Sequence, residues 1–410
     1  MSAVDLYRAV APPNAVDIIG RLAERARERR CLHLTAGRLG GGAAEVLRTA
    51  VPLLNDLGVQ TDWEVTGADP AYFAAVHGLQ AALQGAERLL IEERLEHYLA
   101  LNRLTAKKLR LDADVVVAHD VSPASLVASR SEGRWVWRCH FDCSRPQSDA
   151  WSFFRPIAEQ FDAAVFSLPA FVGSLAVTRY IVAPSIDPLS EKNRDLGAAE
   201  LASALHALAL DRERPLLVQV GPLTRDGDPL AAIAVYRLVK RHHAVRLVLA
   251  GPTGDDRDDA AVLADVREAA QADPDIAVRA LPAEAHGQIN ALQRAATLVL
   301  QMSGRDDYGL AAAEAMWKGK PVIGRASGSL AELIIPEVTG YAVHSIEGAA
   351  FRARHLLNNP ELIPRMGAAG REHVRRGFLL TRHLIDELAL IVDLADGPRG
   401  ARAATPSAPA

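Results

Sequence analysis

The sequence predicts an α/β protein made of two Rossmann-like domains, whose parallel sheets face each other across a cleft. Two observations support this fold class. Short apolar segments typical of buried strands alternate with amphipathic helical segments along the chain, which is the pattern of parallel α/β layers. The chain also has 410 residues, which is more than one hydrophobic core usually supports. Two domains are therefore expected.

The apolar segments place the expected strands in order along both halves. We expect strands at 31–36, 115–119, 136–140 and 164–167 in the first half, and at 216–220, 245–250, 276–280, 297–301, 321–324 and 340–343 in the second. The first helical segments lie at 43–57, 70–83 and 88–102. Because helices separate most successive strands, the connections are those of parallel sheets.

A break in this pattern at 183–193, with two prolines and several polar residues, predicts the boundary between the domains. We assign residues 1–190 to an N-terminal domain and residues 191–380 to a C-terminal domain. A last helix at 381–396 can pack on either domain, including back on the N-terminal one. The segment 397–410 is rich in Ala, Pro, Gly and Ser, which predicts a disordered tail.

Composition and charge exclude several classes of protein. A net charge of -4 argues against a general nucleic-acid binder, which needs a basic surface. No apolar run is long enough to cross a bilayer and the N-terminus lacks a signal-peptide pattern, so we expect a cytoplasmic protein without membrane insertion. Cys31, Cys139 and Cys143 are few and odd in number, which predicts free thiols and no metal site.

The segment 301–324 is the most informative part of the chain. Asp306 follows a predicted strand, and Glu314 lies eight residues later, one turn into the next helix. Acids at these places project into the crevice where doubly wound sheets bind nucleotides. The alternative is an exposed loop acid and a surface glutamate, but the alanines around Glu314 indicate close packing. Lys318 and Lys320 suit the basic end of that helix.

Polar residues in the first domain also fall where strands are expected to end. The glycines Gly40, Gly41 and Gly42 open the first helix, where backbone N–H groups can approach an anion or sugar hydroxyls; a plain tight turn is the alternative. His119-Asp120 and His140-Phe141-Asp142 follow two other strands, so they are expected to face the cleft. Such residues bind substrate hydroxyls, or else cap helices and fix loops.

Several short motifs, in their order along nearly the whole chain, resemble the retaining GT-B nucleotide-sugar glycosyltransferases of the superfamily that includes sucrose and glycogen synthases. Within it, the resemblance is nearest to trehalose synthases of the glycosyltransferring type. The motifs are Leu32-His33 with Gly40 to Gly42, Trp137 to Asp142, Phe166 to Pro169, Ile186 to Ser190, Trp317 to Pro321 and Glu372 to Arg375.

The resemblance implies a GT-B fold and a hexosyltransferase that moves a hexose, with glucose expected, from a nucleoside diphosphate sugar to a small sugar. The N-terminal domain would bind the acceptor and the C-terminal domain the donor. Glu314 would hold the donor ribose, Asp306 would contact the transferred sugar, and His140 would lie beside the reacting carbon. The other acceptor-site candidates are Asp120, Asp142 and Gly40 to Gly42. Gly309 and Leu310 are further donor-site candidates, and Arg225 and Arg305 are added to the donor site as nearby cations that can reach the phosphates. No cofactor is implied. Relatives of this kind often form homodimers, and the sequence leaves open whether this chain does so too.

One departure from the family pattern affects the diphosphate site. Where the family has an arginine and a lysine, this chain has Pro222 and Gly227. Each lost charge-assisted hydrogen bond is worth about 1.5 to 3 kcal/mol. Arg225, Arg305 or Arg325 can replace these cations if the loops bring them close. The alternative is a catalytically degenerate relative that binds sugar or nucleotide, or that partners an active paralogue. Further variants are a phosphorylase, a transferase with a changed substrate or donor, and an epimerase.

Overall fold

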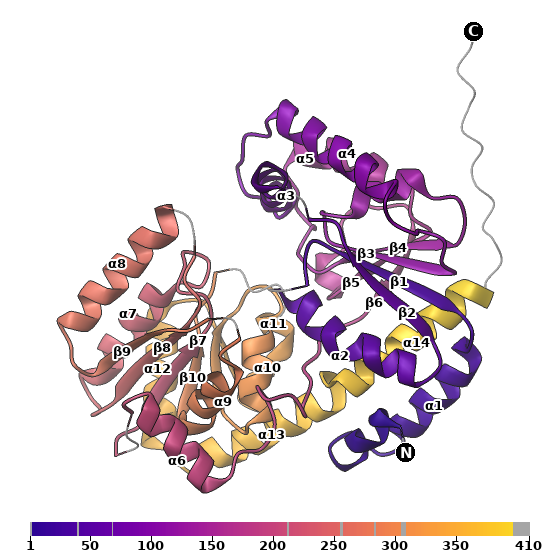
Figure 1. The fold of residues 1–410 in the computed structure, drawn as a ribbon. Coiled ribbons are helices and arrows are strands. Elements are labelled where there is room, and N and C mark those ends of the chain that lie inside the picture. The colour runs from indigo at the N-terminus through magenta and orange to yellow at the C-terminus, as the bar shows by residue number, and fades with distance from the viewer. Residues whose placement is uncertain are drawn as a thin grey trace.

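The two predicted parallel sheets are present in the computed structural model, which confirms the α/β fold class (Figure 1). The structure describes residues 2–38, 41–67, 69–210, 213–254, 257–282, 284–304 and 309–396. Each sheet has six strands, and all the pairs within them are parallel. The predicted tail from 397 lies outside the described residues, as do Gly40, Arg305 and Asp306. Among the described residues no helix is long and apolar enough to cross a bilayer.

The first sheet has the strand order β2-β1-β3-β4-β5-β6. Its strands are β1 (Arg30–Thr35), β2 (Gln60–Val65), β3 (Val115–His119), β4 (Arg134–Cys139), β5 (Ala163–Phe166) and β6 (Thr178–Ile181). The helices of this half are α1 (Ala15–Ala26), α2 (Gly42–Asp56), α3 (Pro70–Leu83), α4 (Glu92–Ala106) and α5 (Ser148–Ala158), with short 3-10 helices at Ala3–Ala9, Ala124–Ser129 and Pro169–Phe171.

Helices cover both faces of this sheet, as the continuous burial of its central strands requires. Apolar side chains of α3, α4 and α5 pack on one face. The other face is covered by α1, α2 and the last helix of the chain, α14 (Leu380–Asp396). In Figure 1, α14 (yellow) lies beside α1 and α2 rather than with the second domain from which the chain arrives. Part of the first core therefore comes from the C-terminus.

The second sheet has the order β12-β11-β10-β7-β8-β9. Its strands are β7 (Leu216–Val220), β8 (Arg246–Gly251), β9 (Ile276–Ala280), β10 (Leu298–Gln301), β11 (Val322–Arg325) and β12 (Gly340–Val343). The helices are α6 (Ala198–Ala207), α7 (Pro229–Lys240), α8 (Arg257–Gln271), α9 (His286–Ala295), α10 (Leu310–Trp317), α11 (Leu330–Leu333), α12 (Ile346–Asn358) and α13 (Leu362–Gly377). Helices α7, α8 and α12 pack on one face, and α6, α9, α10 and α11 on the other.

The chain passes between the domains twice, and the two crossings run side by side. Ile186 in the first crossing donates its N–H to Phe378 O at 2.8 Å and accepts from Leu380 N at 2.9 Å. Asp187 ties this crossing to the first domain, because Tyr7 Oη donates to its Oδ1 at 3.0 Å. Further along the linker, the carbonyls of Glu191 and Arg194 accept hydrogen bonds from Asn290 Nδ2 on α9. These bonds hold the linker on the second domain.

Two strands of the first sheet were not expected from the sequence. β2 reads QTDWEV and alternates between exposed and buried positions, and β6 reads TRYI and is mostly exposed. Both lie at the edges of the sheet. Edge strands keep charged and polar side chains that limit pairing with other molecules, so they lack the continuous apolar run by which the central strands were found.

The contact between α10 and α13 gives a test of the fold that uses two glycines of one helix. A Cβ at Gly367 would lie 2.0 Å from Gly319 O, whereas at Gly370 the nearest atom is 3.5 Å away. Gly367→Ala is therefore expected to destabilise the second domain by about 1 to 3 kcal/mol. Gly370→Ala should be neutral, or stabilising by up to about 1 kcal/mol through helix propensity. Urea unfolding of both variants measures the difference; equal midpoints would contradict this packing.

Candidate active site

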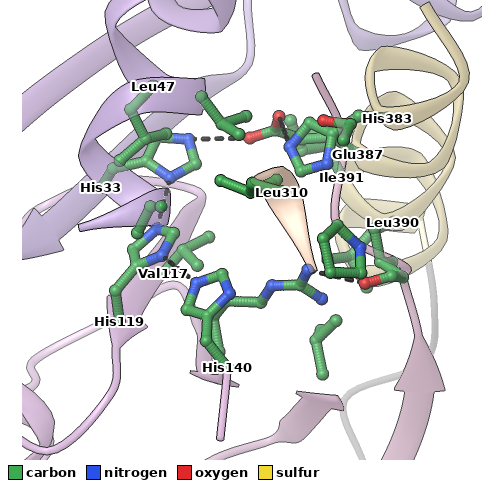
Figure 2. Close-up of a pocket in the computed structure, with 18 residues that line it drawn as sticks. His33, Leu47, Val117, His119, His140, Leu310, His383, Glu387, Leu390 and Ile391 are labelled. Atoms are coloured by element: carbon green, nitrogen blue, oxygen red, sulfur yellow. Dashed lines mark hydrogen bonds and ion pairs between the residues drawn. The ribbon is translucent and has the colours of Figure 1, made fainter. Parts of the chain in front are cut away.

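Side chains from both domains meet around a cavity of about 50 Å³ at the domain border (Figure 2). The first sheet contributes His33, His119, Arg138 and His140, α2 contributes Gly42 and Leu47, α14 contributes His383 and Glu387, and α10 contributes Leu310. A space of this size holds water molecules rather than a sugar. The cavity thus marks where the two halves of the site adjoin, and the sugar ligands would lie beyond it.

Asp120 and His140, which the sequence predicted to face the cleft, are held together by the backbone. Asp120 follows β3 with a left-handed φ of 60°, a conformation that Asp tolerates better than most residues. Its Oδ1 accepts the N–H of His140 at 2.9 Å, and its own N–H donates to Arg138 O at 2.8 Å. Asp120 therefore fixes the end of β4 and the position from which the His140 side chain projects.

The His140 ring is the end of a row of buried side chains that the sequence analysis did not predict (Figure 2). Its Nε2 lies 3.0 Å from His119 Nδ1, and His119 Nε2 lies 3.1 Å from His33 Nδ1. His33 Nε2 in turn lies 2.9 Å from Glu387 Oε1 on α14. The one sequence signal for this row was the alternation of side chains along a strand. By this alternation, His33 and His119 occupy positions that face the same side of the sheet.

Burial and neighbouring charges separate the pKa values of these histidines. Burial lowers the pKa of His119 and of His140 well below 6.5, and the nearby Arg138 lowers both further. Burial also opposes protonation of His33, but Cys31 and the Glu387 carboxylate outweigh it and raise the pKa of His33 from 6.5 to about 10. At neutral pH the row therefore contains one imidazolium, His33, and two neutral imidazoles.

The remaining candidates of the first domain have different surroundings. Gly41 has φ 76° and directly precedes α2, whose first residue Gly42 lines the cavity. The N-terminus of α2 thus adjoins the site, as the glycine-rich segment suggested. Asp142 instead closes a local turn, because its Oδ1 accepts the N–H of Ser144 at 2.9 Å. This is the loop-fixing role that the sequence left open as the alternative.

Glu314 is fully buried, and a lysine that the sequence analysis did not single out lies against it. Lys192 Nζ is 2.7 Å from Glu314 Oε1 and 3.2 Å from both carboxylate oxygens of Glu45 on α2. Burial raises the pKa of Glu314, whereas for Lys192 the two carboxylates outweigh burial and raise the pKa. The pair joins α10 of the second domain to α2 of the first through the linker.

Lys318 is buried rather than a solvated cation at a helix end, which corrects the sequence expectation. Its Nζ donates to Asn193 Oδ1 and to Gln293 Oε1, both at 2.7 Å. Burial lowers the pKa of Lys318 to about 7, although Glu314 opposes this shift. The lysine therefore anchors the linker to the second domain and does not face the cleft as a free charge.

The loop after β7 explains why a lysine is not accommodated at position 227. A Cβ on Gly227 would lie 2.0 Å from Pro222 O, so any side chain there requires the loop to move. Of the candidate replacement cations, Arg225 is exposed and its backbone N–H donates to Asp259 Oδ1. Arg325 at the end of β11 reaches the same loop, with its guanidinium 2.8 Å from Asp228 Oδ2. Arg305 and Asp306 lie outside the described residues.

The start of α10 brings the second domain to the cavity. Gly309 precedes the helix with φ 62°, and a Cβ there would lie 2.7 Å from Ser329 Oγ. Leu310, the first residue of the helix, lines the cavity together with His140. The structure therefore brings Asp120, His140, Gly41, Gly42 and Leu310 to one place. Glu314, one turn further along α10, faces Lys192.

Comparisons with known proteins agree with this arrangement. Residues 33–173 match the family "Trehalose synthase, N-terminal domain", and residues 205–373 match "Glycosyl transferases group 1". A trehalose synthase from Pyrococcus horikoshii is 36% identical over 390 residues, which cover 92% of this chain and 93% of that protein. The prediction of glycosyltransferase ancestry is confirmed.

Solved structures show the same fold at low sequence identity. A sucrose-phosphate synthase from Thermosynechococcus elongatus superposes with a TM-score of 0.70 at 17% identity, over 90% of this chain and 100% of that one. The Escherichia coli structure "Trehalose-6-phosphate from E. coli bound with UDP-2-fluoro glucose" gives a TM-score of 0.70 at 14% identity, over 89% and 99% of the two chains. The predicted GT-B architecture is thereby confirmed.

The ion pair at Glu314 predicts unequal effects of removing its neighbours. Lys192→Met would leave the Glu314 carboxylate buried without a cation, which is expected to cost about 3 to 5 kcal/mol of unfolding free energy. Glu45→Gln removes an acid that is 38% exposed and should cost at most about 1 kcal/mol. Chemical unfolding of both variants gives the comparison. Equal losses would show that Lys192 does not stabilise the domain border through Glu314.

The raised pKa of His33 predicts a loss of stability at high pH. The folded-state pKa lies above the ordinary value of 6.5, so the contribution of the imidazolium is fully present below pH 6.5 and is lost as pH rises to about 10. The difference in unfolding free energy between the wild type and His33→Gln should therefore shrink across this interval. Urea unfolding at a series of pH values measures it, and a difference that grows with pH would contradict the assignment.

Proposed function

Because this chain belongs to the trehalose synthase family of the group 1 glycosyltransferases, we propose that it transfers a hexose, with glucose as the first choice, from a nucleoside diphosphate sugar to a small sugar. The transfer retains the anomeric configuration. The observation that carries the proposal is the meeting of His140 from the first domain and Leu310 from the second at one cavity. Ligands bound to the two domains would adjoin there.

The acceptor would bind on the first domain, at the end of β4 and the start of α2. Asp120 holds the backbone N–H of His140, which keeps the acid next to the point from which the imidazole projects. The N–H groups at the start of α2 add a positive dipole end to the same place. As the new glycosidic bond forms, the nucleoside diphosphate leaves with the electron pair of the broken bond, and the proton of the acceptor hydroxyl passes to a phosphate oxygen of this leaving group.

The donor would bind over the strand ends of the second sheet, near the start of α10. Glu314 would meet the ribose after Lys192 moves aside. Lys192 would keep an acidic partner as it moves, because it also contacts both oxygens of Glu45, and the ribose hydroxyls would take its place at Glu314. This movement would couple donor binding to the contact between the domains.

Arg325 is the best placed substitute for the missing diphosphate cations. Its strand ends beside the loop that carries the diphosphate ligands in the family, and its guanidinium reaches Asp228 in that loop. A bound diphosphate would compete with Asp228 for the guanidinium, which offers a bidentate fork to phosphate oxygens. Arg225 is exposed further along the loop and serves as a natural comparison.

Calorimetry with a nucleoside diphosphate tests this role of Arg325. Arg325→Met is expected to weaken binding by about 10- to 100-fold, the value of one charge-assisted hydrogen bond or bidentate pair. Asp228→Asn should tighten binding, because asparagine can still cap α7 through the N–H of Ala231 but no longer neutralises Arg325. Arg225→Met is the matched control and should bind as the wild type does. Weaker nucleotide binding in Arg225→Met alone would show that Arg225, and not Arg325, contacts the diphosphate.

Turnover decides between the transferase and a second candidate function. Pro222, the closed loop at Gly227 and the buried Glu314 favour a degenerate relative that binds a sugar or nucleotide without catalysis. Incubation with labelled nucleoside diphosphate glucose and free glucose should give a labelled disaccharide, whose anomeric configuration NMR reports. Binding of the nucleotide without any product from several donor and acceptor pairs would support the second candidate. No binding at millimolar nucleotide would exclude the transferase.

A further inference from the structure

The row of histidines links the candidate acceptor site to the last helix of the chain through unbroken side-chain contacts. Glu387, His33, His119 and His140 are all buried, and the three contacts between them measure 2.9, 3.1 and 3.0 Å. Figure 2 shows the three rings one after another along one wall of the cavity, with Glu387 opposite His33 on α14. His33 and His119 each use both ring nitrogens within this row, and His140 uses Nε2.

Counting hydrogens along the row shows that it has a direction. Each contact between two ring nitrogens is a hydrogen bond only if one of them carries a hydrogen and the other accepts it. The Glu387 carboxylate accepts, so His33 Nε2 carries a hydrogen. If His33 is an imidazolium, its Nδ1 also donates. His119 then accepts at Nε2 and donates from Nδ1, and His140 accepts at Nε2 and keeps its own hydrogen on Nδ1.

A neutral His33 reverses every hydrogen bond beyond it. Its Nδ1 would then accept from His119 Nε2, and His119 Nδ1 would accept from His140 Nε2, so that His140 would carry its hydrogen on Nε2. The two arrangements have the same heavy-atom positions. What separates them is the charge on His33, which depends on the carboxylate beside it.

We propose that Glu387 is a positioning residue which, by pairing with the His33 imidazolium, holds His140 in the tautomer with its hydrogen on Nδ1. In the proposed arrangement the substrates lie beyond the cavity, so Glu387 would not touch them. It acts through two buried rings on the residue that does, in the way that carboxylates orient histidines in many enzymes. The consequence for catalysis rests on the proposed function, whereas the tautomer is a property of the protein itself.

The other charged and titratable groups around the row are consistent with one imidazolium at His33. On β1, Cys31 Sγ lies 3.6 Å from His33 Nε2. On β4, the Arg138 guanidinium donates to Val182 O and disfavours a second positive charge on His119 or His140. On α14, His383 Nε2 lies 3.4 Å from Glu387 Oε2, and its pKa is lowered by burial, while Arg382 pairs with Asp386. Asp120 at the end of β3 holds the His140 N–H.

The chain offers a matched pair of variants on α14. Glu387→Gln removes the charge that faces His33 but keeps the size of the side chain. Asp386→Asn removes a carboxylate from the next position on the same helix, where it pairs with Arg382 and does not contact the row. Both variants change the net charge by the same amount. They differ in their contacts, because Glu387 faces His33 and His383 whereas Asp386 pairs with Arg382.

Nitrogen NMR of protein labelled at histidine reads the tautomers directly, because ring nitrogens with and without hydrogen resonate far apart. His140→Gln identifies the His140 signals. In the wild type and in Asp386→Asn, His140 should carry its hydrogen on Nδ1; in Glu387→Gln it should shift to Nε2 or to a mixture. A wild-type His140 with hydrogen on Nε2 overturns the proposal, and so does an unchanged signal in folded Glu387→Gln. If Glu387→Gln does not fold, the wild-type spectrum alone tests the proposal, through the position of the hydrogen on the His140 ring.

Kinetics then test the consequence for the reaction. Glu387→Gln is expected to lower kcat by about 10- to 100-fold, the range found when a group that orients a metal-bound histidine is removed, with KM for the donor unchanged. Asp386→Asn should keep the wild-type kcat. Equal kcat values for both variants, or a change in KM alone, would refute the positioning role. Absence of turnover in the wild type would instead count against the proposed function, and the NMR result would stand.

Discussion

Charges that are buried at the domain border must be paired, and the arrangement of the molecule depends on this constraint. An unpaired carboxylate or ammonium group inside a protein costs several kcal/mol. Here the partners come from distant parts of the chain: Lys192 of the linker pairs with Glu314 of the second domain, and His33 of the first strand pairs with Glu387 of the last helix. Linker, last helix and both domains are therefore held in one relation to each other.

The same constraint governs the cations near the candidate donor site. At the positions where the resemblance implies an arginine and a lysine, this chain has Pro222 and Gly227, and the Pro222 carbonyl leaves no room for a side chain at 227. Positive charge is still present nearby, but it is distributed differently: Arg325 is held by Asp228, and Lys192 by Glu314 and Glu45. In the proposed enzyme, the donor would compete with these internal acids for each cation. Binding affinity would then depend on the strength of the internal pairs as well as on the new contacts.

The sequence predicted the architecture better than the site, for a physical reason. The central strands were found because a run of apolar residues reports burial directly, and Asp120 and His140 were found because parallel strands end at one edge of a sheet. The contacts of Lys192, Lys318 and Glu387 join segments far apart in the chain. No local pattern of residues reports such contacts, since they depend on how the two domains and α14 are placed. Asp306, Arg305 and Gly40 lie outside the described residues, so their roles stay predictions.

The position of α14 also has a consequence for the order in which the protein is made. Leu384, Leu388 and Ile391 cover a face of the first sheet, yet they are among the last described residues to leave the ribosome. The strands of the second sheet all lie before them, so its core can close first, against the usual order of folding from the N-terminus. Until α14 is synthesised, apolar residues on this face of the first domain would stay exposed. Chaperones that bind exposed apolar surfaces could bind the nascent chain during that interval.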